Sequence, residues 1–356
     1  GGSSTGSGGG APFVPGELTG FYPTTVTDSE VRGYYDAWVS GWVEDCGDGS
    51  ARVKWDDTSR TVSEGIGYGM LLAATWEDRT LYDKLWAYYQ RFKNSNGLMG
   101  WKVNGCSGPA DDTGAATDAD LDVAMSLLIA DCKWSDGGYG TSATTVINAV
   151  RNHVMKTDGS RTFLCAGDGW GADCCGNASY QAPAYYRAFG VHTGDTAFWN
   201  QAADDSYYYL AKYDNDTTGL VSDWMDPDSL QCDAKGAGDW HGWDASRVPW
   251  RVVNDYAWWG TAAAQTYSEK IADFVESKGG IAATCSGYSL NGNTCGGTAV
   301  ATFAGAFASS GIASSQARTD AFFQDLKGVE YEGYFNEILR TLYFTLAVKQ
   351  FDYCGK

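Results

Sequence analysis

Apolar residues recur every three or four positions along most of the chain, and Gly-, Asn- and Asp-rich stretches interrupt this pattern. Such spacing places apolar side chains on one face of an α-helix. Twelve helices are therefore predicted, near residues 28–42, 64–76, 79–94, 118–132, 143–156, 183–193, 196–212, 247–260, 262–277, 297–310, 315–327 and 335–350. They are too many and too evenly spread for a four-helix bundle.

No sequence repeat of fixed length accompanies these helices, which argues against a regular solenoid. Twelve helices could pair as six hairpins and close into a ring, although periodicity alone does not establish closure. The pattern predicts an all-α domain with long loops over residues 42–63, 95–117, 157–182 and 213–246. These loops are rich in aromatic and acidic residues, as expected of a surface that carries the functional site.

The first ten residues, GGSSTGSGGG, have the composition of a flexible linker. We expect residues 1–11 to be a linker and residues 12–356 to be a single domain. A linker suggests a modular protein with a binding module upstream, whereas a remnant of expression would have the same composition. No run of 18 apolar residues exists, so no membrane span is expected. No signal peptide is visible, as expected of a mature or trimmed chain.

The composition restricts the partners. The chain has 44 acidic and 25 basic residues and a formal net charge of −19. This charge repels nucleic acid and anionic lipid, so we expect neither as a partner. Fifteen Trp and 22 Tyr residues exceed what a core requires, and their rings suit stacking against sugar rings. The composition favours a carbohydrate cleft over the alternative of a large aromatic core.

The ten cysteines include no CxxC pair, and the three histidines are scattered. This favours disulfides in an exported protein over a metal site, and we predict no metal and no cofactor. Cys285 and Cys295 flank a Gly/Asn-rich loop and are predicted to pair. The adjacent Cys174 and Cys175 are predicted to bond to different partners. Several free buried thiols are the alternative.

Three aspartates open the apolar run ATDADLDVAMSLLIA, residues 116–130. Asp118 lies at the rim of the helix face that is buried, so it either caps the helix, as Thr117 could also do, or faces a cavity. A calcium-binding loop is excluded, because its sixth position would be Val123 instead of Gly and its twelfth Ile129 instead of Glu.

A second acidic motif is VSEGIGYGMLLAA, residues 62–74, in which three glycines follow Glu64. Glycines weaken a helix start, which indicates that the backbone approaches something closely. A glutamate among aromatic residues has a raised pKa, as a general acid requires. A solvated glutamate in the first helical turn is the alternative.

The third motif is DWHGWDASRVPWRVVNDYAWWG, residues 239–260, in which tryptophans bracket Asp244. An aspartate that pairs with Arg247 would keep a low pKa and could act as a base. Alternatively, Arg247 could form an ion pair with Asp255, which lies on the same side of the following helix.

These three stretches resemble a known family. ATDADLDVAMSLLIA, SEGIGYGMLLA (63–73) and WDASR (243–247) are similar to motifs of glycoside hydrolase family 8, in the same chain order. The resemblance spans most of residues 20–350. It implies an (α/α)6 barrel of six inner and six outer helices, with long loops forming a substrate cleft. It also implies inverting hydrolysis of β-1,4-linked polysaccharides.

Carried over residue by residue, the resemblance assigns three catalytic residues. Glu64 matches the proton donor and Asp244 the general base. Asp118 matches the aspartate that holds the sugar at the cleavage point. Arg247 is similar to the arginine that orients the base.

Further residues are expected to bind substrate. Trp101, in LMGWKV, resembles a stacking residue of the cleft, and Tyr185 and Tyr186 lie in APAYYRAF, another stretch similar to the family pattern. Tyr68 and Trp243, within the acidic motifs, complete this set.

The two remaining aspartates of the first motif, Asp120 and Asp122, are expected to be structural. If Asp122 is exposed, its substitution should change the stability little.

The resemblance therefore implies a secreted, monomeric glycoside hydrolase that cleaves internal β-1,4 bonds of cellulose-type or mixed-linkage β-glucan, with water as nucleophile. Endo-xylanase and chitosanase activity are the alternatives within the family. A carbohydrate-binding module that uses the aromatics alone is the alternative outside enzymes, but it would not need the three carboxylates together.

Overall fold

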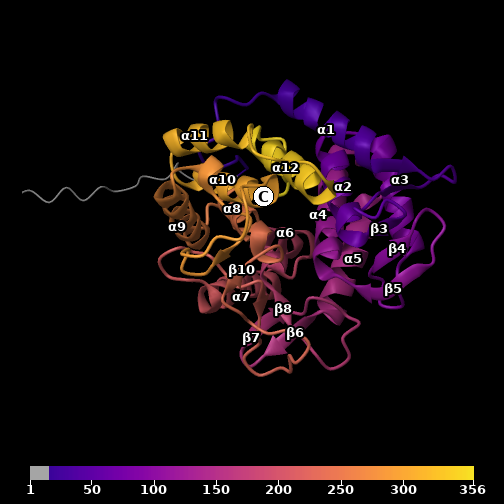
Figure 1. Ribbon diagram of the computed structural model, residues 1–356. Coiled ribbons are helices and arrows are strands. Elements are labelled where there is room, and N and C mark those ends of the chain that lie inside the picture. The colour runs from indigo at the N-terminus through magenta and orange to yellow at the C-terminus, as the bar shows by residue number, and fades with distance from the viewer. Residues whose placement is uncertain (1–15) are drawn as a thin grey trace, which may run out of the picture.

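Residues 16–356 are described by a computed structural model (Figure 1). The expected linker, residues 1–11, lies outside these described residues. Within them the chain forms twelve α-helices: α1 (Asp28–Trp42), α2 (Ser63–Thr75), α3 (Arg79–Arg91), α4 (Thr117–Lys133), α5 (Tyr139–His153), α6 (Pro183–Thr193), α7 (Thr196–Tyr213), α8 (Val248–Trp259), α9 (Ala262–Lys278), α10 (Ala301–Ser309), α11 (Gln316–Leu326) and α12 (Tyr334–Ala347).

All twelve predicted helices are found, with differences at their ends. The largest are at α5, which begins at Tyr139 instead of residue 143, and at α10, which begins at Ala301 instead of residue 297. The start of α5 follows Gly138, whose φ of 66° is a left-handed conformation that glycine adopts without strain. The spacing of apolar side chains does not reveal where a backbone conformation of this kind starts a helix.

The even-numbered helices form the centre of the molecule. α2, α4, α6, α8, α10 and α12 contact one another in that order, and α12 contacts α2 in turn. Figure 1 shows α12, in yellow, beside α2 from the early part of the chain. Each odd-numbered helix packs chiefly on one even-numbered helix: α3 on α2, α5 on α4, α7 on α6, α9 on α8, α11 on α10 and α1 on α12.

The two sets of helices differ in burial. Every residue of α10 is buried, and in α2 every residue except Glu64 is buried. Small residues permit this close packing: a Cβ atom on Gly305 of α10 would lie 2.1 Å from the ring of Tyr343 in α12. The odd-numbered helices bury one face only, so their apolar periodicity is clearer in the sequence.

Short strands and 3-10 turns lie between the helices, so the domain is not purely α-helical as expected. The sequence did not reveal these strands because most have only two to four residues, too few for an alternating pattern. They are β1 (Val43–Asp45), β2 (Ala51–Val53), β3 (Arg60–Val62), β4 (Gly100–Asn104), β5 (Ala110–Ala115), β6 (Met155–Asp158), β7 (Arg161–Leu164), β8 (Gly176–Asn177), β9 (Trp224–Met225), β10 (Trp240–His241) and β11 (Tyr288–Ser289). The 3-10 turns are η1 (Ala178–Tyr180), η2 (Ala245–Arg247), η3 (Ile281–Ala283) and η4 (Ser310–Ala313).

The strands build small antiparallel sheets. β3, β4 and β5 form a three-stranded sheet directly before α2 and α4, and β8 pairs with β9 by placing Asn177 opposite Trp224. β10 leads into the Asp244 turn and η2. These sheets therefore shape the loops at the end of the molecule where α2, α4 and α8 begin.

All ten cysteines lie in the described residues, and they form five disulfides: Cys46–Cys106, Cys132–Cys354, Cys165–Cys174, Cys175–Cys232 and Cys285–Cys295. The predicted Cys285–Cys295 pair is confirmed. So is the prediction that Cys174 and Cys175 bond to different partners.

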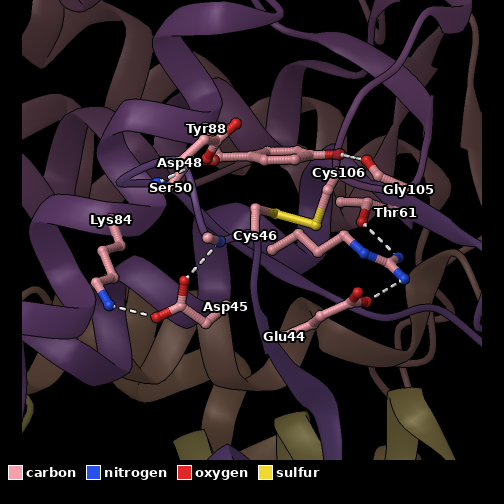
Figure 2. The surroundings of a disulfide bond; sticks show 12 residues. Glu44, Asp45, Cys46, Asp48, Ser50, Thr61, Lys84, Tyr88, Gly105 and Cys106 are labelled. Carbon is pink, nitrogen blue, oxygen red and sulfur yellow. Dashed lines mark hydrogen bonds and ion pairs between the residues drawn. A yellow bond between two sulfur atoms is a disulfide. The ribbon is translucent and has the colours of Figure 1, made fainter.

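One disulfide fastens the sheet that borders α2. Cys46 follows β1, and Cys106 lies at the turn between β4 and β5 (Figure 2). In the same view the hydroxyl of Tyr88 in α3 donates a hydrogen bond to the carbonyl of Gly105 at 2.6 Å. The tip of the β4–β5 hairpin is therefore held both covalently and by a hydrogen bond.

Among residues 16–356, no helix is both long enough and apolar enough to cross a bilayer.

Candidate active site

One guanidinium nitrogen joins the first two acidic motifs to the third. Nη1 of Arg247, in η2, lies 3.0 Å from Oε2 of Glu64, 2.8 Å from Oδ2 of Asp118 and 2.9 Å from the hydroxyl of Tyr68. Glu64 and Asp118 each occupy the second position of their helices, α2 and α4. The two helix starts and η2 therefore bring together carboxylates that are 54 residues apart in the chain.

Glu64 is the carboxyl group of this cluster that solvent reaches. Its side chain is 21% exposed, and its Oε1 accepts a hydrogen bond from the hydroxyl of Tyr334 at 3.2 Å. The pKa of Glu64 is raised to about 7, chiefly by burial; Arg247 opposes this shift and the negative charge of Asp118 adds to it. Glu64 can therefore hold a proton near neutral pH, and the alternative of a solvated first-turn glutamate is wrong.

Asp118 is buried and does not cap its helix. The N-cap of α4 is Ala116, which makes no side-chain cap, and Oδ1 of Asp118 accepts the adjacent N–H of Ala119 at 2.9 Å. The hydroxyl of Thr117 donates instead to the carbonyl of Cys165. Of the two interpretations left open by the sequence, the capping one is therefore wrong. Burial raises the pKa of Asp118, and Arg247 opposes this shift.

Asp244 is held apart from this cluster. Nδ2 of Asn177 donates to Oδ1 of Asp244 at 2.8 Å, whereas Arg247 reaches only the backbone carbonyl of Asp244, at 3.4 Å. The expected pairing of the Asp244 carboxylate with Arg247 is therefore wrong. The alternative pairing of Arg247 with Asp255 is also wrong, because Asp255 binds Arg187 at 3.0 Å.

The other two aspartates of the first motif are structural, as expected, but both are fully buried. Asp122 receives two hydrogen bonds from Arg251 of α8, at 2.5 and 2.7 Å. Oδ1 of Asp120 accepts the hydroxyl of Tyr89 at 2.6 Å and the N–H of Met99 at 3.0 Å. The interpretation of Asp122 as an exposed residue that tolerates substitution is wrong, because α8 covers it.

Two hollows meet at Glu64. One, of about 380 Å³, is lined by Trp55, Asp56, Glu64, Trp243, Glu332, Gly333, Tyr334, Phe335 and Asn336. The other, of about 190 Å³, is lined by Trp55, Val62, Ser63, Glu64, Trp101, Ala116, Asp118 and Tyr180. Glu64 and Trp55 border both, so the two hollows adjoin at these residues. Together they form a cleft with aromatic walls.

Some of the expected substrate-binding residues line the cleft, and others are buried in the protein. Trp101 and Trp243 line the cleft, and Trp243 is 50% exposed. Tyr68 is fully buried behind Glu64, where it contacts Arg247. Tyr185 and Tyr186 are buried in the core, packed against Trp258 and Trp199 respectively. The expectation that these two tyrosines contact substrate is wrong, because the face of α6 that carries them points into the protein.

Several cleft residues were missed by the sequence reasoning. Trp55, Tyr180, Tyr334 and Phe335 line the hollows, and Asn177 binds Asp244. Trp55, Asn177 and Tyr180 lie in loops that were expected to border the functional site, whereas Tyr334 and Phe335 lie at or beside the start of a predicted helix. No local pattern distinguishes Asn177 from other loop asparagines.

The arrangement provides two carboxyl groups in different environments. Glu64 can hold a proton near neutral pH, and Asp244 accepts a hydrogen bond from the amide of Asn177. This is the division of roles that acid–base catalysis needs. No group of three or more His, Cys, Asp or Glu side chains within the described part of the chain is arranged to hold a metal ion.

Comparison with known proteins points to the same family as the three sequence motifs. The profile of the family described as "Glycosyl hydrolases family 8" matches residues 25–349. Endoglucanase C of Ruminiclostridium cellulolyticum is 36% identical over 287 residues, which cover 78% of this chain and 61% of that protein. Endoglucanase A of Acetivibrio thermocellus is 34% identical over 345 residues, which cover 90% of this chain and 70% of that protein.

A solved structure is also similar. The apo structure of a beta-1,3-1,4-glucanase from Paenibacillus sp. X4 superposes with a TM-score of 0.84 at 28% identity, covering 92% of this chain and 94% of that one. The family profile, the sequence relatives and the shared fold lead to one conclusion: this chain belongs to glycosyl hydrolase family 8.

Proposed function

We propose that this chain is an inverting endo-β-1,4-glucanase in which Glu64 is the general acid and Asp244 the general base. The observation that carries the proposal is Glu64 itself: a carboxyl group with a pKa raised to about 7, exposed at the junction of two aromatic hollows. A general acid works best when its pKa lies near the working pH.

In the proposed reaction a β-linked glucan lies along the cleft with the scissile bond at Glu64. Glu64 transfers its proton to the glycosidic oxygen as the C–O bond breaks. On the opposite face of the sugar, Asp244 takes a proton from a water molecule, whose oxygen bonds to the anomeric carbon. Inverting enzymes separate the two carboxyl groups by about 6.5–9.5 Å to admit this water.

The separate contacts of the two carboxyl groups support these roles. Glu64 belongs to the Arg247 cluster, whereas Asp244 is bound by Asn177, and the charge of Asp244 helps to raise the pKa of Glu64. We assign to Asp118 the role of holding the sugar at the cleavage point. Arg247 then positions Glu64 and Asp118 rather than the base, because its side-chain contacts are with them.

Trp101 and Trp243, which line different hollows beside Glu64, serve as stacking platforms for sugars of the bound chain. Aromatic residues in both hollows that adjoin Glu64 suit a glycan chain that extends through both. This arrangement favours cleavage of internal bonds.

We further propose that the ring of even-numbered helices, with the odd-numbered helices outside it, is an (α/α)6 barrel. The contact of α12 with α2 supports closure. Five disulfides support a secreted protein, since disulfides persist in oxidising compartments. We expect the domain to act as a monomer and a carbohydrate-binding module to precede the linker in the full protein.

The proposed substrate is cellulose-type or mixed-linkage β-glucan. The names of the sequence relatives, two endoglucanases, and of the similar structure, a beta-1,3-1,4-glucanase, support this choice. Xylan and chitosan are the competing substrates, because a cleft of this kind accommodates other β-1,4-linked chains and its acidic lining would attract a polycation.

One experiment tests substrate and stereochemistry together. The protein is incubated with carboxymethyl cellulose, barley β-glucan, xylan and chitosan, and proton NMR follows the anomers during early hydrolysis of the preferred glycan. We expect β-glucan to be cleaved fastest and the α-anomer to appear first. A β-anomer as first product would exclude the inverting mechanism and the role of Asp244 as base. If only xylan or only chitosan is cleaved rapidly, that glycan is the substrate in place of β-glucan.

A further inference from the structure

Asp223 contacts both segments that hold Asp244. Its carbonyl accepts the N–H of Ala178 at 3.2 Å, directly beside Asn177, and its own N–H donates to the carbonyl of Trp240 at 3.1 Å. Asp223 also precedes β9, the strand that pairs with β8 and thereby with Asn177. Its backbone therefore connects the strand that carries the partner of Asp244 to the strand that leads into the Asp244 turn.

The carboxylate of Asp223 closes that turn. Oδ1 accepts the N–H of Gly242 and the N–H of Ala245, each at 2.8 Å. These two N–H groups bracket Trp243 and Asp244. A single oxygen therefore fixes the backbone on both sides of the proposed base. Charge-assisted hydrogen bonds of this kind are stronger than those between neutral groups.

Asn177 completes the support from the other side. Its Nδ2 donates to Oδ1 of Asp244, and its own Oδ1 accepts the N–H and the hydroxyl of Ser179 at 3.0 and 2.9 Å. The amide of Asn177 is thus held in one orientation. Asp223 sets the backbone of the turn, and Asn177 sets the carboxylate that the turn presents.

Gly242 is adapted to this contact. A Cβ atom at position 242 would lie 2.5 Å from Oδ2 of Asp223 and 2.9 Å from the ring of Trp240. Any side chain at this position would have to displace the Asp223 carboxylate. The absence of a side chain at Gly242 therefore allows the Asp223 carboxylate to lie against the turn.

We propose that Asp223 is a positioning residue for catalysis, which holds the 242–245 turn so that Asp244 meets the attacking water in the correct geometry. This inference rests on the proposed role of Asp244 as base. Burial raises the pKa of Asp223 to about 6 against the opposing effect of its two N–H bonds, and the charge of Asp244 adds to the increase. The two N–H bonds stabilise the ionised carboxylate of Asp223 although Asp244, a second acid, raises its pKa. This is consistent with a role of Asp223 in holding the 242–245 turn in place.

Two substitutions at position 223 separate the hydrogen bonds from the charge. Asn retains an oxygen that can accept both N–H groups, whereas Ala removes it. We expect Asp223→Ala to lower kcat at least ~10-fold with a much smaller change in KM, because misplacement of a reacting group by about 1 Å can cost ~10²-fold in rate. Asp223→Asn should recover most of the loss.

Gly242→Ala gives an independent test, because it keeps the carboxylate but displaces it. It should reproduce the low kcat of Asp223→Ala, and it carries the test if Asp223→Ala does not fold. The matched control is Asp226→Ala: Asp226 lies in the same loop and accepts the backbone N–H of Ala237 at 3.3 and 3.4 Å. It should leave kcat close to that of the parent enzyme.

β-Cellobiosyl fluoride distinguishes a base defect from an acid defect, since fluoride leaves without a proton but water must still be deprotonated. Glu64→Gln should regain rate on this substrate, whereas Asp244→Asn and Asp223→Ala should not. Parent-like kcat in both Asp223→Ala and Gly242→Ala would overturn the inference, and so would recovery of Asp223→Ala on the fluoride. Full activity of Asp244→Asn would instead overturn the proposed function.

Discussion

Asp122 and Arg251 form a buried, two-bonded ion pair one helical turn beyond Asp118 and Arg247. The same two elements, α4 and the η2–α8 segment, therefore contribute two successive aspartate–arginine pairs, of which only the first borders the cleft. The inner pair links α4 to α8, two central helices that are separated by α6 in the order of contacts, and so fixes their relative position. The outer pair, in which Arg247 binds Asp118, can then hold Asp118 at the cleft in a defined geometry.

Asp122→Asn should destabilise the domain strongly. Removing one partner leaves the Arg251 guanidinium buried without its counter-charge, which costs about 3–5 kcal/mol. Chemical denaturation measures this loss. Asp136→Asn is the control, because Asp136 is 74% exposed in an ion pair with Arg79 and should change the stability by less than about 0.5 kcal/mol. Equal stability of the two variants would contradict the inferred importance of the inner pair.

Glu64→Gln should retain the shape of the site and lose the transferable proton. We expect kcat on β-glucan to fall at least ~10²-fold, while binding of a cello-oligosaccharide and the melting temperature change little. Glu332→Gln is the matched control, since Glu332 lines the same hollow but is exposed. If the two variants have similar kcat values, Glu64 is not the acid.

The activity should fall as the pH rises through neutrality. The acid must be protonated to act, and the pKa of Glu64 is raised to about 7. The protonated fraction of Glu64 therefore decreases from pH 6 to pH 8, and kcat/KM on a soluble β-glucan should decrease with it. Glu64→Gln has no such proton, so its residual rate should lack this alkaline decline. An alkaline limb that persists unchanged in the variant would assign it to another group.

Asp120 should make the domain less stable as the pH rises. Burial raises the pKa of Asp120 to about 8, far above the value of an unfolded aspartate of about 4. The folded state thus binds a proton that the unfolded state has released, so this contribution is present below pH 4 and is lost as the pH rises to 8. Asp120→Asn stays neutral, so its melting temperature should decline less between pH 5 and pH 8 than that of the parent. Parallel declines would contradict the prediction.

The Cys46–Cys106 disulfide should support the Trp101 wall of the cleft. It fastens the tip of the hairpin whose first strand, β4, carries Trp101 (Figure 2). Replacing both cysteines by serine should lower the stability by roughly 2–5 kcal/mol, since a disulfide that closes a long loop restricts the unfolded chain. KM should rise more than kcat falls, because the role we propose for Trp101 is to bind substrate and not to transfer a proton.

The matched variant is Cys285→Ser with Cys295→Ser. These cysteines are only 10 residues apart, against 60 for Cys46 and Cys106, and neither lines the cleft hollows. Their loss should leave KM unchanged. A similar rise in KM in both double variants would mean that the effect is not specific to the β4–β5 hairpin.

The sequence by itself determined where the helices lie and which three carboxylate residues are candidates for the site. Helical periodicity is a local property, so all twelve helices were predictable from neighbours three and four residues apart. Glu64, Asp118 and Asp244 were identifiable because each lies in a short motif with its own neighbours. The Cys285–Cys295 pair was predictable for the same reason, since it closes a loop of 10 residues.

Only the tertiary structure decided which groups these carboxylates meet. Arg247 lies three residues from Asp244, yet its side chain binds Glu64, 183 residues away, because η2 turns it toward the starts of α2 and α4. Asn177 reaches Asp244 across 67 residues through the pairing of β8 with β9. Tyr185 and Tyr186 lie in a motif that resembles the family pattern, but the packing of α6 turns both into the core. A motif specifies the type of side chain, whereas packing between distant segments sets its direction and surroundings.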